Sequence, residues 1–142
     1  MSRLATGIFG EQIKDVTTEN AISFLGDQDA RVLATPWMIG YMEMTARDAV
    51  KPHLSDTEDT VGTHVDVRHV AAAPIGAKVQ FQAVVTGIEG RRVTFRVTAR
   101  TVAAEPETIG EGTHERAVID VKRFAEKLRT KRDGTQAGSA ER

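Results

Sequence analysis

The pattern of apolar residues divides the chain into a helical first part and an alternating second part. Between Pro36 and Val50, apolar residues cover far more than the third of a helix circumference that a surface helix usually buries. Thr35 is a suitable N-cap, Pro36 fits the first helical turn, and Lys51 with the proline after it supplies a stop. The pattern therefore predicts one long buried helix that begins at Thr35.

Downstream of this helix the period changes from 3.6 to 2, which is typical of strands. The alternation predicts strands over residues 61–70, 77–86, 92–100 and 108–121, and glycines at 87 and 90 bracket a hairpin connection between the middle pair. In the first of these strands one face is expected to carry Val61, Thr63, Val65, Val67 and His69. On the next two strands, one face is apolar throughout and the other polar, so both are half-buried antiparallel strands.

Weaker signals complete the expected architecture. They predict a short strand over Glu11–Val16, one or two helical turns over Ala21–Leu25 and a short terminal helix over Lys122–Arg129. We expect an α+β fold in which an antiparallel sheet of about five strands wraps the long helix, with residues 1–130 as a single domain and 131–142 as a flexible polar tail. Gly40 inside the helix is tolerable where a neighbouring element comes close. A free edge strand also favours a homodimer, and the sequence leaves a tetramer open.

Composition excludes several function classes. Nineteen basic and twenty acidic residues give a net charge of −1, which favours neither nucleic acid nor an anionic membrane as a partner. The chain has no cysteine, so a disulfide framework, a thiolate nucleophile and a cysteine metal site are all excluded. No apolar run is long enough for export or membrane insertion, and no ligand spacing typical of a metal site occurs, so we expect a cytoplasmic protein without metal.

Two polar residues on the long helix are candidates for chemistry. Thr35 and Glu43 are eight positions apart, roughly 80° around the helix, so they can border a single pocket. The ordinary alternative for Thr35 is that it only caps the helix. For Glu43 the alternative is an i, i+4 ion pair with Arg47.

His69 is the third candidate, because it lies in line with the valines that must meet the helix carrying Glu43. The alternative is a hydrogen-bonded core or strand-end histidine, whereas His64 and His114, with polar neighbours, are expected at the surface. A hydroxyl, a carboxylate and an imidazole that converge can activate water or a nucleophile. Gly62 precedes this site on the strand, where its bare backbone N–H could serve as an oxyanion donor.

Arginines recur along the third long strand. We expect them to form its solvated face, and one or two of them could instead meet the phosphates of a bulky anionic ligand. They are Arg91, Arg92, Arg96 and Arg100.

At this point the chain resembles a known family. The matching segments are Ala34-Thr35 with Met38-x-Gly40-x-Met42-Glu43, Val61-Gly62-Thr63, His69 with Ala71-Ala72-x-Pro74-x-Gly76, Glu89-Gly90-Arg91-Arg92, and Ile109-Gly110-x-Gly112-Thr113-His114-Glu115-Arg116-Ala117-Val118-Ile119. They are similar to the hot-dog thioesterases, and most closely to their fluoroacetyl-CoA thioesterase-like branch, from about Leu33 to Phe124. The phenylalanine-lined pocket lid of that branch has no counterpart in Gly26–Ala34.

The resemblance implies a hot-dog fold and an acyl-CoA thioesterase that needs no cofactor beyond the CoA of its substrate. It implies catalytic roles for Thr35, Glu43 and His69, and substrate-binding roles for Gly62 and Arg116. The function we expect is hydrolysis of a short or small acyl-CoA to carboxylate and free CoA. The alternatives are an acyl-thioester hydratase or dehydratase, which would leave the thioester intact, and a non-catalytic acyl-CoA-binding module.

Overall fold

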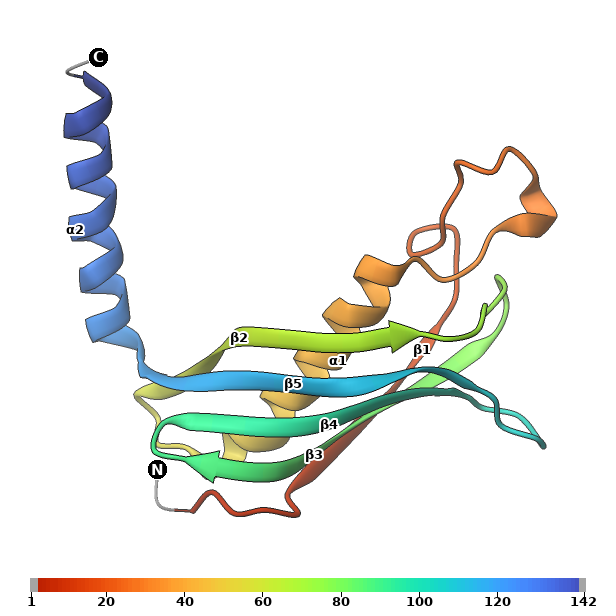
Figure 1. Cartoon of the computed structure of the whole chain (residues 1–142), viewed down its shortest axis with the longest axis horizontal. Coiled ribbons are helices and arrows are strands. Elements are labelled where there is room, and N and C mark those ends of the chain that lie inside the picture. Colours follow the sequence, from red (N-terminus) through yellow and green to blue (C-terminus); the bar gives the residue numbers. More distant parts are fainter. Residues whose placement is uncertain (1–2, 141–142) are drawn as a thin grey trace.

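The computed structural model describes residues 3–140, with side chains described for residues 3–135. Its elements are β1 (Phe9–Asp15), α1 (Thr35–Val50), β2 (Glu58–His69), β3 (Lys78–Glu89), β4 (Arg92–Thr101), β5 (Thr108–Asp120) and α2 (Val121–Ala140), with 3-10 turns at Gln28–Ala30 and Lys51–His53. The strands form one antiparallel sheet in the order β1-β3-β4-β5-β2, and α1 crosses one face of it (Figure 1). The predicted α+β fold, a long helix wrapped by about five strands, is confirmed.

The β3–β4 hairpin supplies a large share of the core. Alternate residues of both strands are almost completely buried against α1, namely Val79, Phe81, Ala83 and Val85 on β3 and Val93, Phe95, Val97 and Ala99 on β4. Their burial confirms the predicted alternation. The connection is tighter than predicted, because β3 continues to Glu89 and Gly90 makes the turn with a φ of 62°, in the left-handed region that favours glycine.

Helix α1 differs from its prediction at both its start and its surface. Its N-cap is Ala34, and Thr35 is already helical, so the prediction that Thr35 caps the helix is wrong. The helix is also buried on one side only: Met38 and Met42 are buried, whereas Trp37 and Met44 are 48% and 49% exposed. A side chain at Gly40 would meet no atom within 4 Å, so this chain alone does not supply the close neighbour expected there.

Strand β2 lies at a free edge of the sheet and contains a bulge. Among the described strands it pairs only with β5, and the register shifts between Gly62 and His64, which leaves Thr63 as an extra residue. A side chain at Gly62 would contact Glu43 of α1, so Gly62 faces the helix and Val61 faces away. The prediction that Val61 shares a face with His69 is therefore wrong, because the bulge reverses the alternation between them.

The two chain ends also depart from the predictions. The short strand near the N-terminus is present as β1, but Ala21–Leu25 is not helical: Ala21 forms an isolated bridge with Leu33, and Phe24 and Leu25 are exposed. A helix this short needs a packed apolar face, which these side chains do not find. Helix α2 is longer than predicted; it continues through residues 131–140 and projects from the end of the sheet (Figure 1). Within residues 3–140, neither helix combines the length and hydropathy needed to cross a bilayer.

Candidate active site

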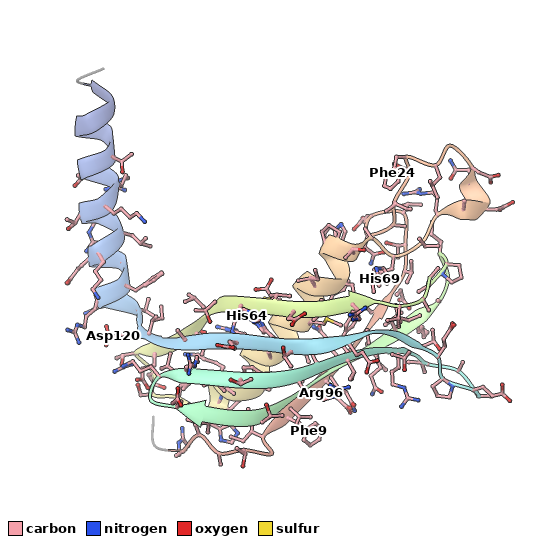
Figure 2. The ribbon with its side chains drawn as sticks, in the orientation of Figure 1. Phe9, Phe24, His64, His69, Arg96 and Asp120 are labelled. Atoms are coloured by element: carbon pink, nitrogen blue, oxygen red, sulfur yellow. The ribbon has the colours of Figure 1, made fainter. Side chains whose placement is uncertain are left out.

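Thr35 and His69 meet where α1 begins and β2 ends. The Oγ1 atom of Thr35 lies 2.7 Å from Nδ1 of His69, a short hydrogen bond between residues 34 positions apart. Thr35 can make this bond because its hydroxyl is not used as a helix cap. Figure 2 shows His69 at the end of β2, close to the first turn of α1. We call these two residues the Thr–His pair.

A cavity of about 400 Å³ opens beside the Thr–His pair. Apart from Thr35 and His69 its lining is apolar: Ile22, Phe24, Val32, Leu33, Val70, Ala71 and Ala72. Phe24 is 79% exposed and belongs to the loop that precedes α1 (Figure 2). The expectation that Gly26–Ala34 contributes no aromatic side chain holds, but the same loop brings Phe24 to the cavity from just outside that segment.

The surroundings of His69 favour its neutral imidazole. Burial lowers the pKa of His69, and a backbone contact at Ala71 offsets part of this effect. Among the buried side-chain nitrogen and oxygen atoms of the described residues, Nε2 of His69 alone has no hydrogen-bond partner. Buried polar atoms are normally paired, so an unpaired one beside a cavity is where a ligand or water could bind.

Glu43 lies in a second cluster, further along α1. A Cβ on Gly62 would lie 2.7 Å from Oε2 of Glu43, 3.3 Å from His114 and 3.5 Å from Arg116, so only glycine leaves room there for the carboxylate. Nη1 of Arg116 lies 3.7 Å from Oε2 of Glu43, within ion-pair range but longer than a hydrogen bond. We call Glu43, Gly62, His114, Arg116 and Thr60 the Glu43 cluster; Thr60 belongs to it because it accepts hydrogen bonds from Arg116.

The i, i+4 ion pair that could have explained Glu43 does not form. Arg47 instead binds Asp59 at 3.0 and 2.6 Å and the neighbouring Asp48 at 3.0 Å. The bond from Arg47 holds the pKa of Asp59 down at about 2. Glu43 thus has Arg116, and not Arg47, within ion-pair range, and the side chain of Glu43 is 37% exposed.

Arg116 and His114 are buried beneath Glu43. Arg116 is 7% and His114 1% exposed, so the prediction that His114 lies at the surface is wrong. The polar neighbours of His114 in the sequence face outward, while His114 itself points toward the core side of β5. His64 does lie at the surface, as expected, with its side chain 54% exposed.

Within one chain the predicted residues form two groups rather than one. Thr35 contacts His69, and Glu43 lies against Gly62 and Arg116. Eight helical residues separate Thr35 from Glu43 by about 12 Å along the axis. Seven strand residues separate Gly62 from His69 by roughly 20 Å.

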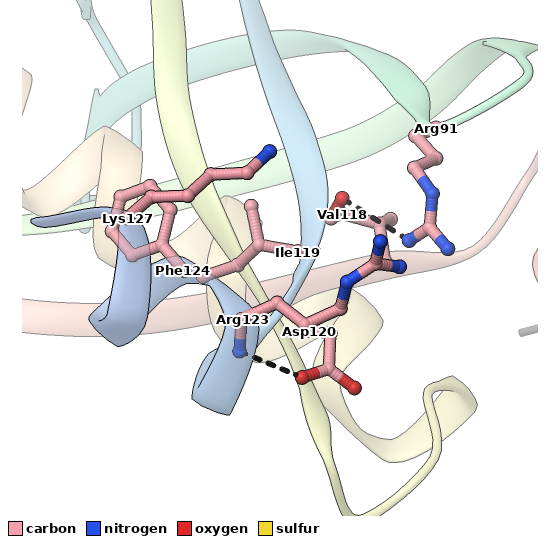
Figure 3. Close-up of a pocket in the computed structure, with 7 residues that line it drawn as sticks. All are labelled: Arg91, Val118, Ile119, Asp120, Arg123, Phe124 and Lys127. Atoms are coloured by element: carbon pink, nitrogen blue, oxygen red, sulfur yellow. Dashed lines mark hydrogen bonds between the residues drawn. The ribbon is translucent and has the colours of Figure 1, made fainter. Parts of the chain in front are cut away.

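A different cavity, of about 280 Å³, lies where α2 leaves the sheet (Figure 3). Its lining includes the basic residues Arg91 and Lys127 and the acidic residue Asp120, whose carboxylate accepts a hydrogen bond from the backbone N–H of Arg123 at 3.1 Å. No member of the Thr–His pair or the Glu43 cluster lines it.

The arginines of the hairpin and β4 behave as a solvated face. Arg96 pairs with Glu111 at 2.8 Å, Arg91 lies 3.6 Å from Glu58, and Arg92 pairs with Glu89. Across the part of the chain with described side chains, no three histidine, aspartate or glutamate residues gather in a way that could hold a metal ion.

The sheet wrapped on α1, with a polar pair at an apolar cavity, defines a hot-dog domain, and solved structures agree. A solved structure of fluoroacetyl-CoA thioesterase superposes on this chain with a TM-score of 0.78 and 34% sequence identity, and the match covers 90% of this chain and 97% of that one. A thioesterase superfamily member from Thermus thermophilus has a TM-score of 0.86 and 29% identity, over 96% and 99% of the two chains.

Sequence comparison then gives the family. The family model described as fluoroacetyl-CoA-specific thioesterase matches residues 16–122. The fluoroacetyl-CoA thioesterase of Streptantibioticus cattleyicolor is 43% identical over 100 residues, which cover 70% of each chain. The chain belongs to this family, and it is a thioester hydrolase of the acyl-CoA thioesterase class.

Proposed function

We propose that the protein hydrolyses a short or small acyl-CoA at a site built from Thr35, His69 and Glu43. The observation that carries this proposal is the 2.7 Å bond between Thr35 and His69 at the mouth of an apolar cavity, with Nε2 of His69 unpaired. A related enzyme, a variant of fluoroacetyl-CoA thioesterase, has been solved in complex with acetyl-CoA, and its structure overlays on this chain with a TM-score of 0.79. The cavity of about 400 Å³ suits a small acyl group.

In the proposed reaction His69 is the general base and then the general acid. Its lowered pKa keeps the imidazole neutral near pH 7, ready to accept a proton. In one route Glu43 attacks the thioester carbonyl, the C–S bond breaks to release CoA as the thiolate, and water that gives a proton to His69 then cleaves the transient acyl-enzyme. In the other route Glu43 orients water, which gives a proton to His69 as it attacks the carbonyl, and the C–S bond breaks. In both routes His69 passes this proton to the CoA thiolate. Thr35 holds the imidazole and hydrogen-bonds to the carboxylate or the reacting oxygen. No metal or organic cofactor takes part in this scheme.

Gly62 and Arg116 have supporting roles. The backbone N–H of Gly62 stabilises the oxyanion, and the absence of a side chain there leaves the space that the Glu43 carboxylate occupies. Arg116 was expected to contact the substrate, and its burial favours action through Glu43 instead. It supplies a positive charge beside the carboxylate and fixes its direction.

The separation of the two groups within one chain leads us to propose a homodimer with shared sites. The free edge of β2 can pair antiparallel with its copy across a two-fold axis. If that axis passes between Val65 and Asp66, Gly62 comes close to the partner's His69. The Thr–His pair of one subunit then faces the Glu43 cluster of the other. A second copy would also cover apolar surface on α1 and supply the neighbour that Gly40 lacks.

Release of free thiol from a panel of acyl-CoAs tests the reaction. We expect turnover of at least one short acyl-CoA, with losses of about a hundredfold or more in both His69→Ala and Glu43→Gln. His53→Gln, a histidine outside both groups, is the matched control and should keep wild-type activity. Binding of acyl-CoA without thiol release by the wild type would favour the hydratase or binding-module alternatives.

Mixing the two inactive variants tests the shared site. In a mixed dimer of His69→Ala and Glu43→Gln chains, one site carries both substitutions and the other carries neither. Random assortment should therefore restore about a quarter of the wild-type activity. If each site lies within one chain, the co-expressed mixture stays as inactive as its components.

A further inference from the structure

The polar groups buried beneath Glu43 form a network in which the proposed reaction gives a role to Arg116 and none to His114. It joins Thr60, His114 and Arg116, and its two charged or titratable members are almost fully enclosed. Polar groups are costly to bury unless all of their hydrogen bonds are made. The arrangement of donors and acceptors in the network therefore carries information about what each residue does.

Arg116 is held on three sides. Its Nε donates to Oγ1 of Thr60 at 2.7 Å and its Nη2 donates to the Thr60 carbonyl at 2.9 Å. On the third side, Nη1 lies 3.1 Å from Nε2 of His114. A guanidinium has five N–H donors and no acceptor, so Nε2 of His114 must be the acceptor of this bond.

The other nitrogen of His114 fixes its tautomer. Nδ1 lies 2.8 Å from the backbone carbonyl of His64, and a carbonyl oxygen can only accept. A neutral imidazole with its proton on Nδ1 satisfies both contacts at once. A ring with a proton on Nε2 would point an N–H at the N–H of Arg116.

The surroundings of His114 favour the neutral ring on balance. Burial lowers the pKa of His114, and the Arg116 cation acts in the same direction, whereas the His64 carbonyl and Glu43 act in the opposite one. Phe95 of β4 stacks on the imidazole with 6.1 Å between ring centroids and 27° between planes, which fixes its orientation. The acceptor nitrogen is thus held toward Arg116.

We propose that His114 is a positioning residue whose Nε2 lone pair aims the Arg116 guanidinium at Glu43. One N–H of Nη1 is taken by His114, and its second N–H is left for the carboxylate at 3.7 Å. The carboxylate is directed without a close hydrogen bond, so its oxygens stay available for water or the thioester. This inference rests on the catalytic role proposed for Glu43.

Two amide substitutions separate positioning from a purely structural role. In His114→Gln the side-chain oxygen can reach the place of Nε2 and accept from Arg116, whereas His114→Asn keeps a donor near Nδ1 and loses that acceptor. We expect kcat to fall about 10- to 100-fold in the Asn variant with KM little changed, and to be largely retained in the Gln variant. Equal losses, or a larger loss in the Gln variant, would overturn the proposal. Thermal unfolding of both variants, with His53→Gln as control, shows whether each is folded.

A spectroscopic measurement on the wild type is independent of activity. Nitrogen-15 NMR of the histidine side chains at pH 7 should show His114 with its proton on Nδ1 and with Nε2 unprotonated. A ring protonated on Nε2 contradicts the positioning role even if the enzyme is active. An inactive enzyme with the expected tautomer would instead refute the proposed function and leave the hydrogen-bond assignment intact.

Discussion

The Thr–His pair and the Glu43 cluster are built in opposite ways. The pair is a single direct hydrogen bond at the mouth of an apolar cavity, and the only buried polar atom left unpaired among the described side chains belongs to it. The cluster places a half-exposed carboxylate over a buried network in which every polar group has a partner. The pair therefore presents a free ring nitrogen beside a cavity, whereas the cluster surrounds its carboxylate with groups whose hydrogen bonds are already made.

Of the substitutions that compare the Glu43 cluster with the Thr–His pair, we expect the largest loss of activity from a substitution of Gly62. In Gly62→Ala the new methyl group would displace the flexible end of Glu43 and leave the backbone unchanged, so we expect activity to fall about a hundredfold with little loss of stability. Gly87→Ala is the matched control, because a side chain there meets only Thr94, at 3.8 Å. Thiol release and urea unfolding of both variants check this. A large loss of stability in Gly62→Ala would assign the glycine a role in folding rather than in catalysis.

A smaller effect is expected at the Thr–His pair. Thr35→Val keeps the shape of the side chain and removes the bond to His69, which should lower kcat about tenfold, while Thr35→Ser keeps the hydroxyl and most of the activity. Steady-state kinetics at a fixed pH distinguish the two. Equal activity of the Val and Ser variants would show that the hydroxyl contributes nothing to the reaction.

The smallest effect concerns the ion pair that keeps Arg47 away from Glu43. Because the pKa of Asp59 is lowered to about 2, its pairing with Arg47 stabilises the fold above pH 4 and is lost as the pH falls from about 4 toward 2. Asp59→Asn should therefore cost about 1 kcal/mol or less at pH 7, and its deficit should shrink toward pH 3. Urea unfolding at both pH values measures the change. A deficit independent of pH would show that packing, and not charge, accounts for it.

Much of the fold could be predicted because its signals are local. The alternation along β3 and β4 follows directly from their buried faces, and glycine marks their turn. Thr35, Glu43 and His69 could also be selected from their residue types and their places on α1 and β2. The bulge in β2 could not be predicted, because one extra residue leaves no mark in the composition of the strand. A prediction that assumes a regular strand therefore places Val61 on the side that faces α1 and Gly62 on the opposite side, which is the reverse of the structure.

The buried position of His114 was missed for a related reason. It alternates with outward-facing polar residues on β5, and a histidine followed by charged residues looks like a surface segment. What determines its burial is the opposite strand, where Phe95 stacks on its ring, and a contact between strands is not readable from one of them.

The single extra residue at Thr63 also limits how this strand can change in evolution. Gly62 and His69 are seven positions apart, an odd number, so a regular strand would send them to opposite sides of the sheet. The bulge restores the parity, and both residues face α1. Deletion of one residue here would leave a regular strand of ordinary length, but either Gly62 or His69 would then face away from α1. A change in the length of β2 therefore disturbs the site even where every residue of the strand keeps its identity.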